Sequence, residues 1–210
     1  MQFRSNQFNA PEVTKNLIII NVLFFLATYL LQNQINLYQY LALFHFSTEM
    51  FKPWQIITHM FMHGGFSHLI FNMIALYFVG SRLEQVWGAK KYLNFYLITG
   101  LGAALLHAAV QTYEINHGMI SPYSSSVGAS GAIYGLLVAF ALYWPNTEFL
   151  LYFVLPIKAK YLVIGAIAIA LFSGFTGADE GVAHFAHLGG ALFGYFLVKY
   201  WNKNNRASFF

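Results

Sequence analysis

Four residues of types that support catalysis lie in three short segments of this sequence. Ser130 lies in VGASGAIYG, His68 and Asn72 lie in HLIFN, and His187 lies in AHLGG. A serine hydroxyl can attack a carbonyl when an imidazole takes its proton, and imidazole or amide donors can stabilise the oxyanion that forms. These residue types predict acyl transfer if the fold brings the three segments together.

The composition indicates the solvent that surrounds these segments. Of 210 residues, 58% are hydrophobic and 9% are charged, which is far too apolar for an ordinary soluble domain. The sequence predicts an all-α polytopic membrane protein with six spanning helices, because nothing alternates like a barrel strand. The six stretches are near the length that crosses a bilayer and cover residues 17–31, 66–83, 92–110, 126–144, 161–175 and 182–201. The absence of cysteine excludes disulfides, thiolate catalysis and Cys-ligated zinc.

The distribution of basic residues predicts the orientation. If the amino terminus is cytoplasmic, all Lys and Arg residues except Lys52 lie inside, and both termini are cytoplasmic. The net charge of +4 then reflects topology, so no nucleic-acid partner is expected. No small-residue cleavage site clearly follows the first span, so we expect it to be retained, and a cleaved signal peptide is the alternative.

The loops predict one domain over residues 1–210, with a core at about 54–200, because no linker or repeat interrupts it. The connection at about 32–65 is long, aromatic and broken by polar residues, which is typical of a segment in the membrane interface. Partner binding is the alternative role for this loop. A short apolar piece, residues 149–157, is expected at the cytoplasmic face.

The predicted topology places the catalytic candidates at one depth. The second, fourth and sixth spans run from outside to inside, and Ser130, His187, His68 and Asn72 all lie near their outer ends. Counting at 1.5 Å per residue puts them about 3 to 10 Å below the outer interface. Polar side chains at such depth normally face the bundle interior or a water-filled cavity, so a functional site is expected.

Small residues beside Ser130 and His187 predict that two helices approach closely. The glycines that would pack the fourth span on the sixth are Gly131, Gly135, Gly190 and Gly194. Such a contact would bring the hydroxyl within reach of the imidazole. The first N–H groups of the fourth helix lack partners within the helix and could stabilise an oxyanion.

Three further positions have two interpretations each. His68 and Asn72 are one turn apart and could add oxyanion donors, or they could form an interhelical hydrogen bond. Tyr134, one turn beyond Ser130, could hold the imidazole by stacking or could simply pack. Asp179 and Glu180 could orient His187, but acidic residues before a helix are commonly placed by its dipole.

Two other classes of function remain open at this point. His59, His63 and His68 could ligate a metal ion, although Met60 follows His59 where a metalloprotease helix has glutamate. The polar residues could also line the route of a transporter, which would place polar groups at inner depths as well and would favour an inverted repeat.

Three motifs together resemble those of the rhomboid intramembrane serine proteases, over roughly residues 54–194. HLIFN at 68–72 is similar to the family's HxxxN, GASG at 128–131 to its GxSG, and AHLGGALFG at 186–194 to its AHxxGxxxG. The resemblance implies a six-helix bundle with a water-filled cavity open to the outside. It also implies Ser130 as nucleophile, His187 as base, His68 and Asn72 as oxyanion donors, and Tyr134 stacked on His187.

The same resemblance implies the biological setting. The family cleaves transmembrane helices of other proteins near their outer ends, without a metal or another cofactor. We therefore expect an integral protein of a prokaryotic inner membrane, with its site towards the extracytoplasmic side and transmembrane proteins as substrates.

Two features depart from the common pattern of the family. Trp54-Gln55 stands where many bacterial members have Trp-Arg, which puts a loop-stabilising contact in doubt. No large soluble domain precedes the first span and no seventh helix is expected, so the chain resembles the minimal form. Glu84 and Gly88, in GSRLEQVWG, resemble a structural region of the family.

Overall fold

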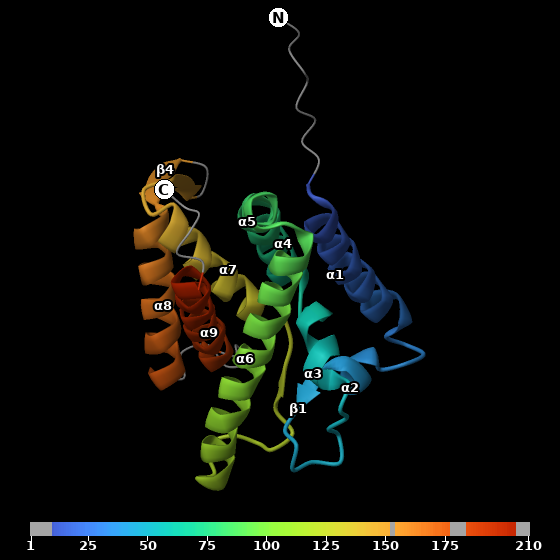
Figure 1. Ribbon diagram of the computed structural model, residues 1–210. Helices are drawn as coiled ribbons and strands as arrows, with labels where there is room; N and C mark the ends of the chain where they lie inside the picture. The colour runs from blue at the N-terminus through green and yellow to red at the C-terminus, as the bar shows by residue number, and fades with distance from the viewer. Residues whose placement is uncertain (1–9, 152–153, 177–183, 205–210) are drawn as a thin grey trace, which may run out of the picture.

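The computed structural model describes residues 10–151, 154–176 and 184–204, which form a bundle of helices with short strands at both ends (Figure 1). In chain order the elements are α1 (Glu12–Leu31), α2 (Leu37–Leu41), β1 (Leu43–Phe44), α3 (Gln55–Thr58), the 3₁₀ turn η1 (His59–Phe61), α4 (Phe66–Ala75), the π-helical turn η2 (Leu76–Gly80), α5 (Ser81–Trp87), α6 (Ala89–Asn116), β2 (Ser125–Ser126), α7 (Ser130–Tyr143), β3 (Glu148–Leu151), β4 (Leu155–Lys158), α8 (Ala159–Thr176) and α9 (His184–Asn204).

Four of the described helices are long and apolar enough to cross a membrane. They are α1, the continuous helix Phe66–Trp87 made of α4, η2 and α5, the 28-residue α6, and α8. The helix α7 is apolar but has only 14 residues. The helix α9 has 21 residues and contains two histidines and two lysines. The chain is therefore mainly helical, with several helices suited to a bilayer.

The prediction of the fourth span was wrong at its beginning, because residues 126–129 are not helical. Ser125–Ser126 instead forms β2, which pairs antiparallel with β1 in the register Leu43↔Ser126. Gly128 has a φ of +130°, which L-residues rarely adopt, and the helix begins only at Ser130. A hydropathy window cannot detect this break, because it averages over the short extended segment and the long apolar helix that follows.

The prediction for residues 149–157 is refined by a hairpin. The strands β3 and β4 pair antiparallel, with Glu148 opposite Lys158 and Phe149 opposite Ile157; residues 152–153 lie outside the described part of the chain. The all-α prediction therefore describes most of the chain but not these two small antiparallel pairs.

The centre of the bundle consists of α6, α7 and α9, each of which packs against the other two. Tyr92, Phe95 and Tyr96 of α6 are fully buried, as is Leu136 of α7. By contrast, α1 fully buries only Thr14, Leu17 and Asn21, and Val13, Ile18, Val22 and Phe25 are partly buried against the core. The helices α6, α7 and α9 thus form the most extensively packed part of the described fold, and two of them carry Ser130 and His187.

A carboxylate attaches α1 to this core. Glu84 of α5 is 4% exposed and accepts hydrogen bonds from Val13 N at 2.9 Å, Thr14 N at 2.7 Å and Thr14 Oγ1 at 2.8 Å. The first N–H groups of α1 have no carbonyl partners within the helix, so the carboxylate caps them. The region around Glu84 was expected to be structural, and its partner is the start of α1.

Candidate active site

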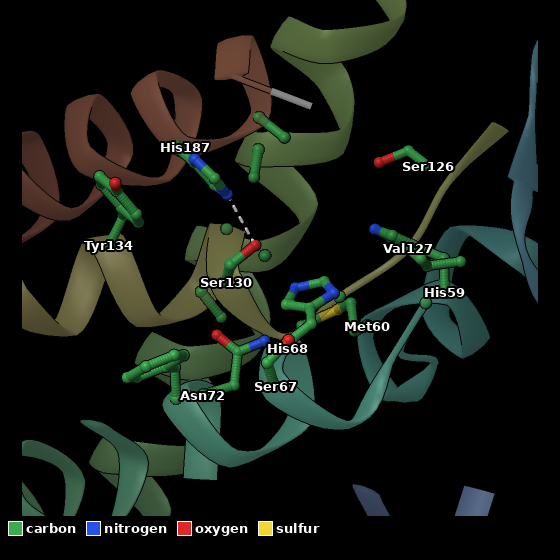
Figure 2. A pocket seen from close by; sticks show the side chains of 18 of the residues that line it. His59, Met60, Ser67, His68, Asn72, Ser126, Val127, Ser130, Tyr134 and His187 are labelled. Atoms are coloured by element: carbon green, nitrogen blue, oxygen red, sulfur yellow. Dashed lines mark hydrogen bonds between the residues drawn. The ribbon is translucent and has the colours of Figure 1, made fainter. Parts of the chain in front are cut away.

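Ser130 and His187 are in direct contact. The Nε2 atom of His187 lies 2.8 Å from Ser130 Oγ (Figure 2). Ser130 is the first residue of α7, and His187 lies in the first turn of the described part of α9. With Nε2 unprotonated, the hydroxyl donates to the imidazole, which is the geometry of a nucleophile beside a general base.

Glycines make this contact sterically possible. A Cβ atom added at Gly190 would overlap the backbone carbonyl of Gly131, and one at Gly194 would lie 2.7 Å from Gly135 Cα. The helices α7 and α9 are thus in backbone contact along this line, as small-xxx-small stripes allow. A third helix takes part as well, since a Cβ at Gly189 would lie 2.9 Å from Ala103 Cα of α6.

Tyr134 and His187 stack face to face. Their ring centroids are 4.4 Å apart and the rings are inclined by only 2° (Figure 2). The spacing of one turn places Tyr134 over the imidazole while Ser130 contacts its Nε2 edge. The tyrosine ring therefore restricts the orientation in which His187 meets the hydroxyl.

Gly128 lies between Ser130 and His68. A Cβ atom at Gly128 would lie 2.9 Å from His68 Cε1 and 3.3 Å from Ser130 Oγ, so any larger residue would fill this space. The N–H of Gly128 donates to the carbonyl of His59 at 2.9 Å, which ties the segment before Ser130 to η1. Space for a substrate carbonyl is thus kept beside the hydroxyl.

Asn72 has a partner that the sequence did not reveal. Its Nδ2 donates to His63 Nε2 at 3.0 Å, which requires His63 to be an acceptor at that atom and therefore neutral. The ring of His68 meets the ring of His63 edge-on, with centroids 5.0 Å apart. His63 thus contacts both of the side chains predicted as oxyanion donors.

The loop histidines are held in their neutral form by burial. Desolvation lowers the pKa of His63 to about 4, and the nearby His68 lowers it further. Desolvation likewise lowers the pKa of His59 to about 4, against a hydrogen bond from its Nδ1 to Gln55 O at 2.8 Å. Neutral imidazoles at these two positions add no charge to the surroundings of Ser130.

A cavity of about 500 Å³ lies beside the Ser130–His187 pair. Ser130, His187, Tyr134, His68 and Asn72 all line it, and Figure 2 shows His68 and Asn72 on the opposite side of Ser130 from His187. This volume is within the range of pockets that bind small molecules or short peptide segments. A carbonyl entering the cavity could meet the hydroxyl, the base and several donors together.

The floor and rim of this cavity include residues outside the predicted set. Met60 is 1% exposed, lines the cavity and would contact a Cβ at Gly100 of α6. Tyr38 of α2 reaches the same space from the long loop. Sequence periodicity could not identify these two residues, because both come from the irregular segment between α1 and α4.

Gln55, which stands where the Trp-Arg pattern of the family would have arginine, forms hydrogen bonds across the loop. Its side chain is fully buried, and Oε1 accepts from Lys52 N at 3.1 Å and Phe44 N at 3.3 Å. Its Nε2 donates to Met50 O at 3.0 Å and Gln39 O at 3.2 Å. One neutral amide thus joins four points of the loop, where neither a short nor an apolar side chain could.

The positions of the histidines bear on the hypothesis of a metal site. Within the described residues, no three His, Asp or Glu side chains come close enough together to hold a metal ion. His59 and His63 instead contact Gln55 and Asn72. Asp179 and Glu180, the candidates for orienting His187, lie outside the described residues.

The fold and site together describe a helical membrane protein with a serine–histidine pair on the wall of an internal cavity. A family model described as the Rhomboid domain matches residues 50–203. The chain therefore belongs to the rhomboid family, as the motifs around Ser130, His187 and His68 predicted.

Individual relatives include named proteases. The chain is 35% identical over 153 residues to Rhomboid protease AarA of Providencia stuartii, covering 67% of this chain and 53% of that protein. It is 33% identical over 149 residues to Rhomboid protease GluP of Bacillus subtilis, covering 69% of this chain and 25% of that protein. RHOMBOID-like protein 4 of Arabidopsis thaliana is 33% identical over 146 residues, covering 70% and 33%. The chain thus spans about half the length, or less, of these relatives.

Proposed function

We propose that this chain is an intramembrane serine endopeptidase that hydrolyses peptide bonds in or near the transmembrane segments of other membrane proteins. The observation that carries the proposal is the 2.8 Å contact between His187 Nε2 and Ser130 Oγ beside a cavity. Membership of a family that includes named proteases supports it.

The reaction begins when Ser130 Oγ forms a bond to the carbonyl carbon and its proton moves to His187 Nε2. The negative charge on the carbonyl oxygen is stabilised by His68, by Asn72 and by N–H groups at the start of α7. His187 then protonates the leaving amine, which departs and leaves an acyl group on Ser130. A water molecule, deprotonated by His187, hydrolyses this ester, and water is the only co-substrate.

Two further groups position the reacting ones. Tyr134 holds the imidazole by stacking, and Gly131, Gly135, Gly190 and Gly194 allow α7 and α9 to approach. Hydrogen bonding to His63 leaves Asn72 Nδ2 a second hydrogen with which to contact the oxyanion.

The arrangement in the membrane is part of the same proposal. Six spanning segments cross the bilayer with both termini cytoplasmic, and the cavity opens towards the extracytoplasmic side of a prokaryotic inner membrane. Residues 1–210 act as one domain with a core at about 54–200, and the loop at about 32–65 lies in the outer interface. The charge asymmetry supports this orientation, since only Lys52 lies on the outer side.

The test uses purified protein in lipid vesicles with a fluorescent single-span substrate. Ser130→Ala should lower the cleavage rate by at least about 10³-fold and abolish labelling by a fluorophosphonate, because the nucleophile is lost. Ser81→Ala is the matched control, since the buried Ser81 hydroxyl has no hydrogen-bond partner among the described residues and lies far along the same helix as His68. Cleavage that survives in Ser130→Ala would refute the proposal.

A further inference from the structure

A second pocket lies at the other end of the bundle from the Ser130 cavity. It has a volume of about 570 Å³ and is lined by Trp87, Lys90, Lys91, Asn94 and Trp201. On α9, Trp201 follows His187 by enough residues to lie about 21 Å further along the axis. Figure 1 shows the end of α5 close to the start of α1 and far from α2 and α3.

Interlocked aromatic rings form the wall of this pocket. The rings of Trp87 and Trp201 are perpendicular with centroids 5.6 Å apart. The ring of Phe95 lies 4.8 Å from Trp87 and 5.6 Å from Trp201, and it is fully buried. Because each of the three rings packs against the other two, the tryptophan rings form an ordered apolar wall that can exclude water from one side of a ligand.

The opening of the pocket is cationic. Lys91 Nζ lies 4.6 Å from the centre of the Trp201 ring and 5.8 Å from that of Trp87, and Lys90 is exposed beside it. The carboxylate on α5, Glu84, is occupied by the cap of α1. Within the described part of the chain neither lysine is paired with a carboxylate. Two positive charges at this point therefore have no carboxylate partner among the residues that the structure describes.

These features fit an anion rather than a cation. Tryptophan faces bind quaternary ammonium groups, but here the ammonium of Lys91 already lies over the Trp201 face. Two ammonium groups and the Asn94 amide instead offer several donors to phosphate oxygens. The tryptophan rings are suited to the headgroup level of a bilayer, where one side of a ligand is apolar and the other is wet.

We propose that this pocket binds the phosphate group of an anionic membrane lipid, with Lys90 and Lys91 as its counter-ions and with Trp87 and Trp201 against the glycerol end of the acyl chains. The pocket lies where the membrane-crossing helices Phe66–Trp87 and Ala89–Asn116 meet, so the lipid tails can remain in the hydrocarbon layer. A bound lipid would brace the junction of α5, α6 and α9. This site is independent of the chemistry at Ser130.

Thermal unfolding of the full chain in a neutral detergent tests the site. Addition of dioleoyl phosphatidylglycerol should raise the midpoint by about 5 °C, whereas phosphatidylcholine with the same chains should give a much smaller rise. The double variant Lys90→Gln/Lys91→Gln should lose most of the phosphatidylglycerol shift. Lys158→Gln/Lys160→Gln removes the same charge outside the pocket and should keep the shift.

Each alternative occupant gives a different result. Equal shifts with both lipids would show that the pocket does not select an anion, and a shift with inorganic phosphate alone would assign the site to the free ion. Equal loss in both double variants would mean diffuse surface attraction. Lys90→Gln alone should lose about half of the shift, since Lys90 is exposed and its loss is compatible with folding. A full shift in Lys90→Gln and in the double variant Lys90→Gln/Lys91→Arg, each with one positive charge left in the pocket, would overturn the proposal.

Discussion

Two groups of polar side chains within this bundle differ in whether they leave open space beside them for a ligand. Around Glu84, both carboxylate oxygens accept hydrogen bonds from the start of α1, and the group is enclosed by α5 and α1. Around Ser130, the hydroxyl and imidazole contact each other at the wall of a cavity of about 500 Å³. The first group is closed, and the second can accept a substrate.

The difference shows why burial of a polar residue does not identify a functional site in a membrane protein. A buried polar group needs partners whatever its role. At Glu84 two of the three donors are backbone N–H groups without carbonyl partners within α1, so the arrangement serves stability. At Ser130 the neighbouring donors line open space, so the arrangement can serve a reaction. Variants in the two regions should therefore affect different measurements.

The largest effect is expected where the site depends directly on helix packing. Gly190→Ala places a Cβ against the backbone of Gly131, which cannot move as a flexible side chain would. We expect a loss of about 3 kcal/mol in the free energy of unfolding, together with loss of cleavage. The measurement is unfolding in mild detergent beside a cleavage assay.

Gly165→Ala is the control for that change, because a Cβ at Gly165 of α8 meets no atom within 4 Å among the described residues outside its own stretch of helix. It should be neutral or should stabilise the helix by about 0.5–1 kcal/mol. If Gly190→Ala were as stable as the control, α7 and α9 would not be in the close contact described.

The next largest effect separates catalysis from stability. His68→Ala should lower kcat by about 10²-fold, the usual cost of removing one oxyanion donor, while the unfolding midpoint changes little. His117→Ala is a suitable control, since His117 is exposed beyond the end of α6. A fall in stability that matched the fall in kcat would make His68 a packing residue like those around Glu84.

Some of this site was predictable from the sequence because its geometry is local. The small residues next to Ser130 and His187 predict that the hydroxyl and the imidazole meet. The spacing of Ser130 and Tyr134 by one turn left both stacking and plain packing open for the tyrosine, and only the family resemblance implied stacking. Residues one helical turn apart lie on the same face, so their spacing in the sequence indicates that their side chains are neighbours. The class of fold and the family followed from the same segments.

The remainder depended on contacts between distant segments. The β1–β2 pair joins residues about 80 positions apart and moves the start of α7 from 126 to 130. The partners of Gln55 are backbone groups of an irregular loop, and the bond from Asn72 to His63 depends on how that loop folds over α4. Composition and periodicity contain no information on either arrangement.

A smaller effect is expected for the closed group. Glu84→Gln replaces an acceptor oxygen with an NH₂ group, so at least one donor at the start of α1 loses its partner, at a cost of about 1–3 kcal/mol. Cleavage by the folded protein should be unchanged, because the cavity is not involved. Glu12→Gln removes the same charge at an exposed position of α1 and should change stability by less than about 0.5 kcal/mol. Reduced kcat in Glu84→Gln would link the two groups.

The most gradual effect is a dependence of stability on pH. The pKa of His63 is lowered from 6.5 to about 4 in the folded protein, so above pH 6.5 both folded and unfolded states are neutral at this residue. Between pH 6.5 and 4 the unfolded chain binds a proton that the folded chain does not, and the free energy of unfolding falls as the pH falls. The decline from His63 levels off below about pH 4.

His63→Gln isolates this contribution, because a glutamine oxygen can still accept from the Asn72 amide but does not titrate in this range. Unfolding midpoints measured from pH 7.5 to 4.5 should decline less steeply in the variant than in the wild type. Identical slopes would mean that folding does not lower the pKa of His63. Protonation at Nε2 would remove the acceptor for Asn72, so acid should also weaken the oxyanion donors.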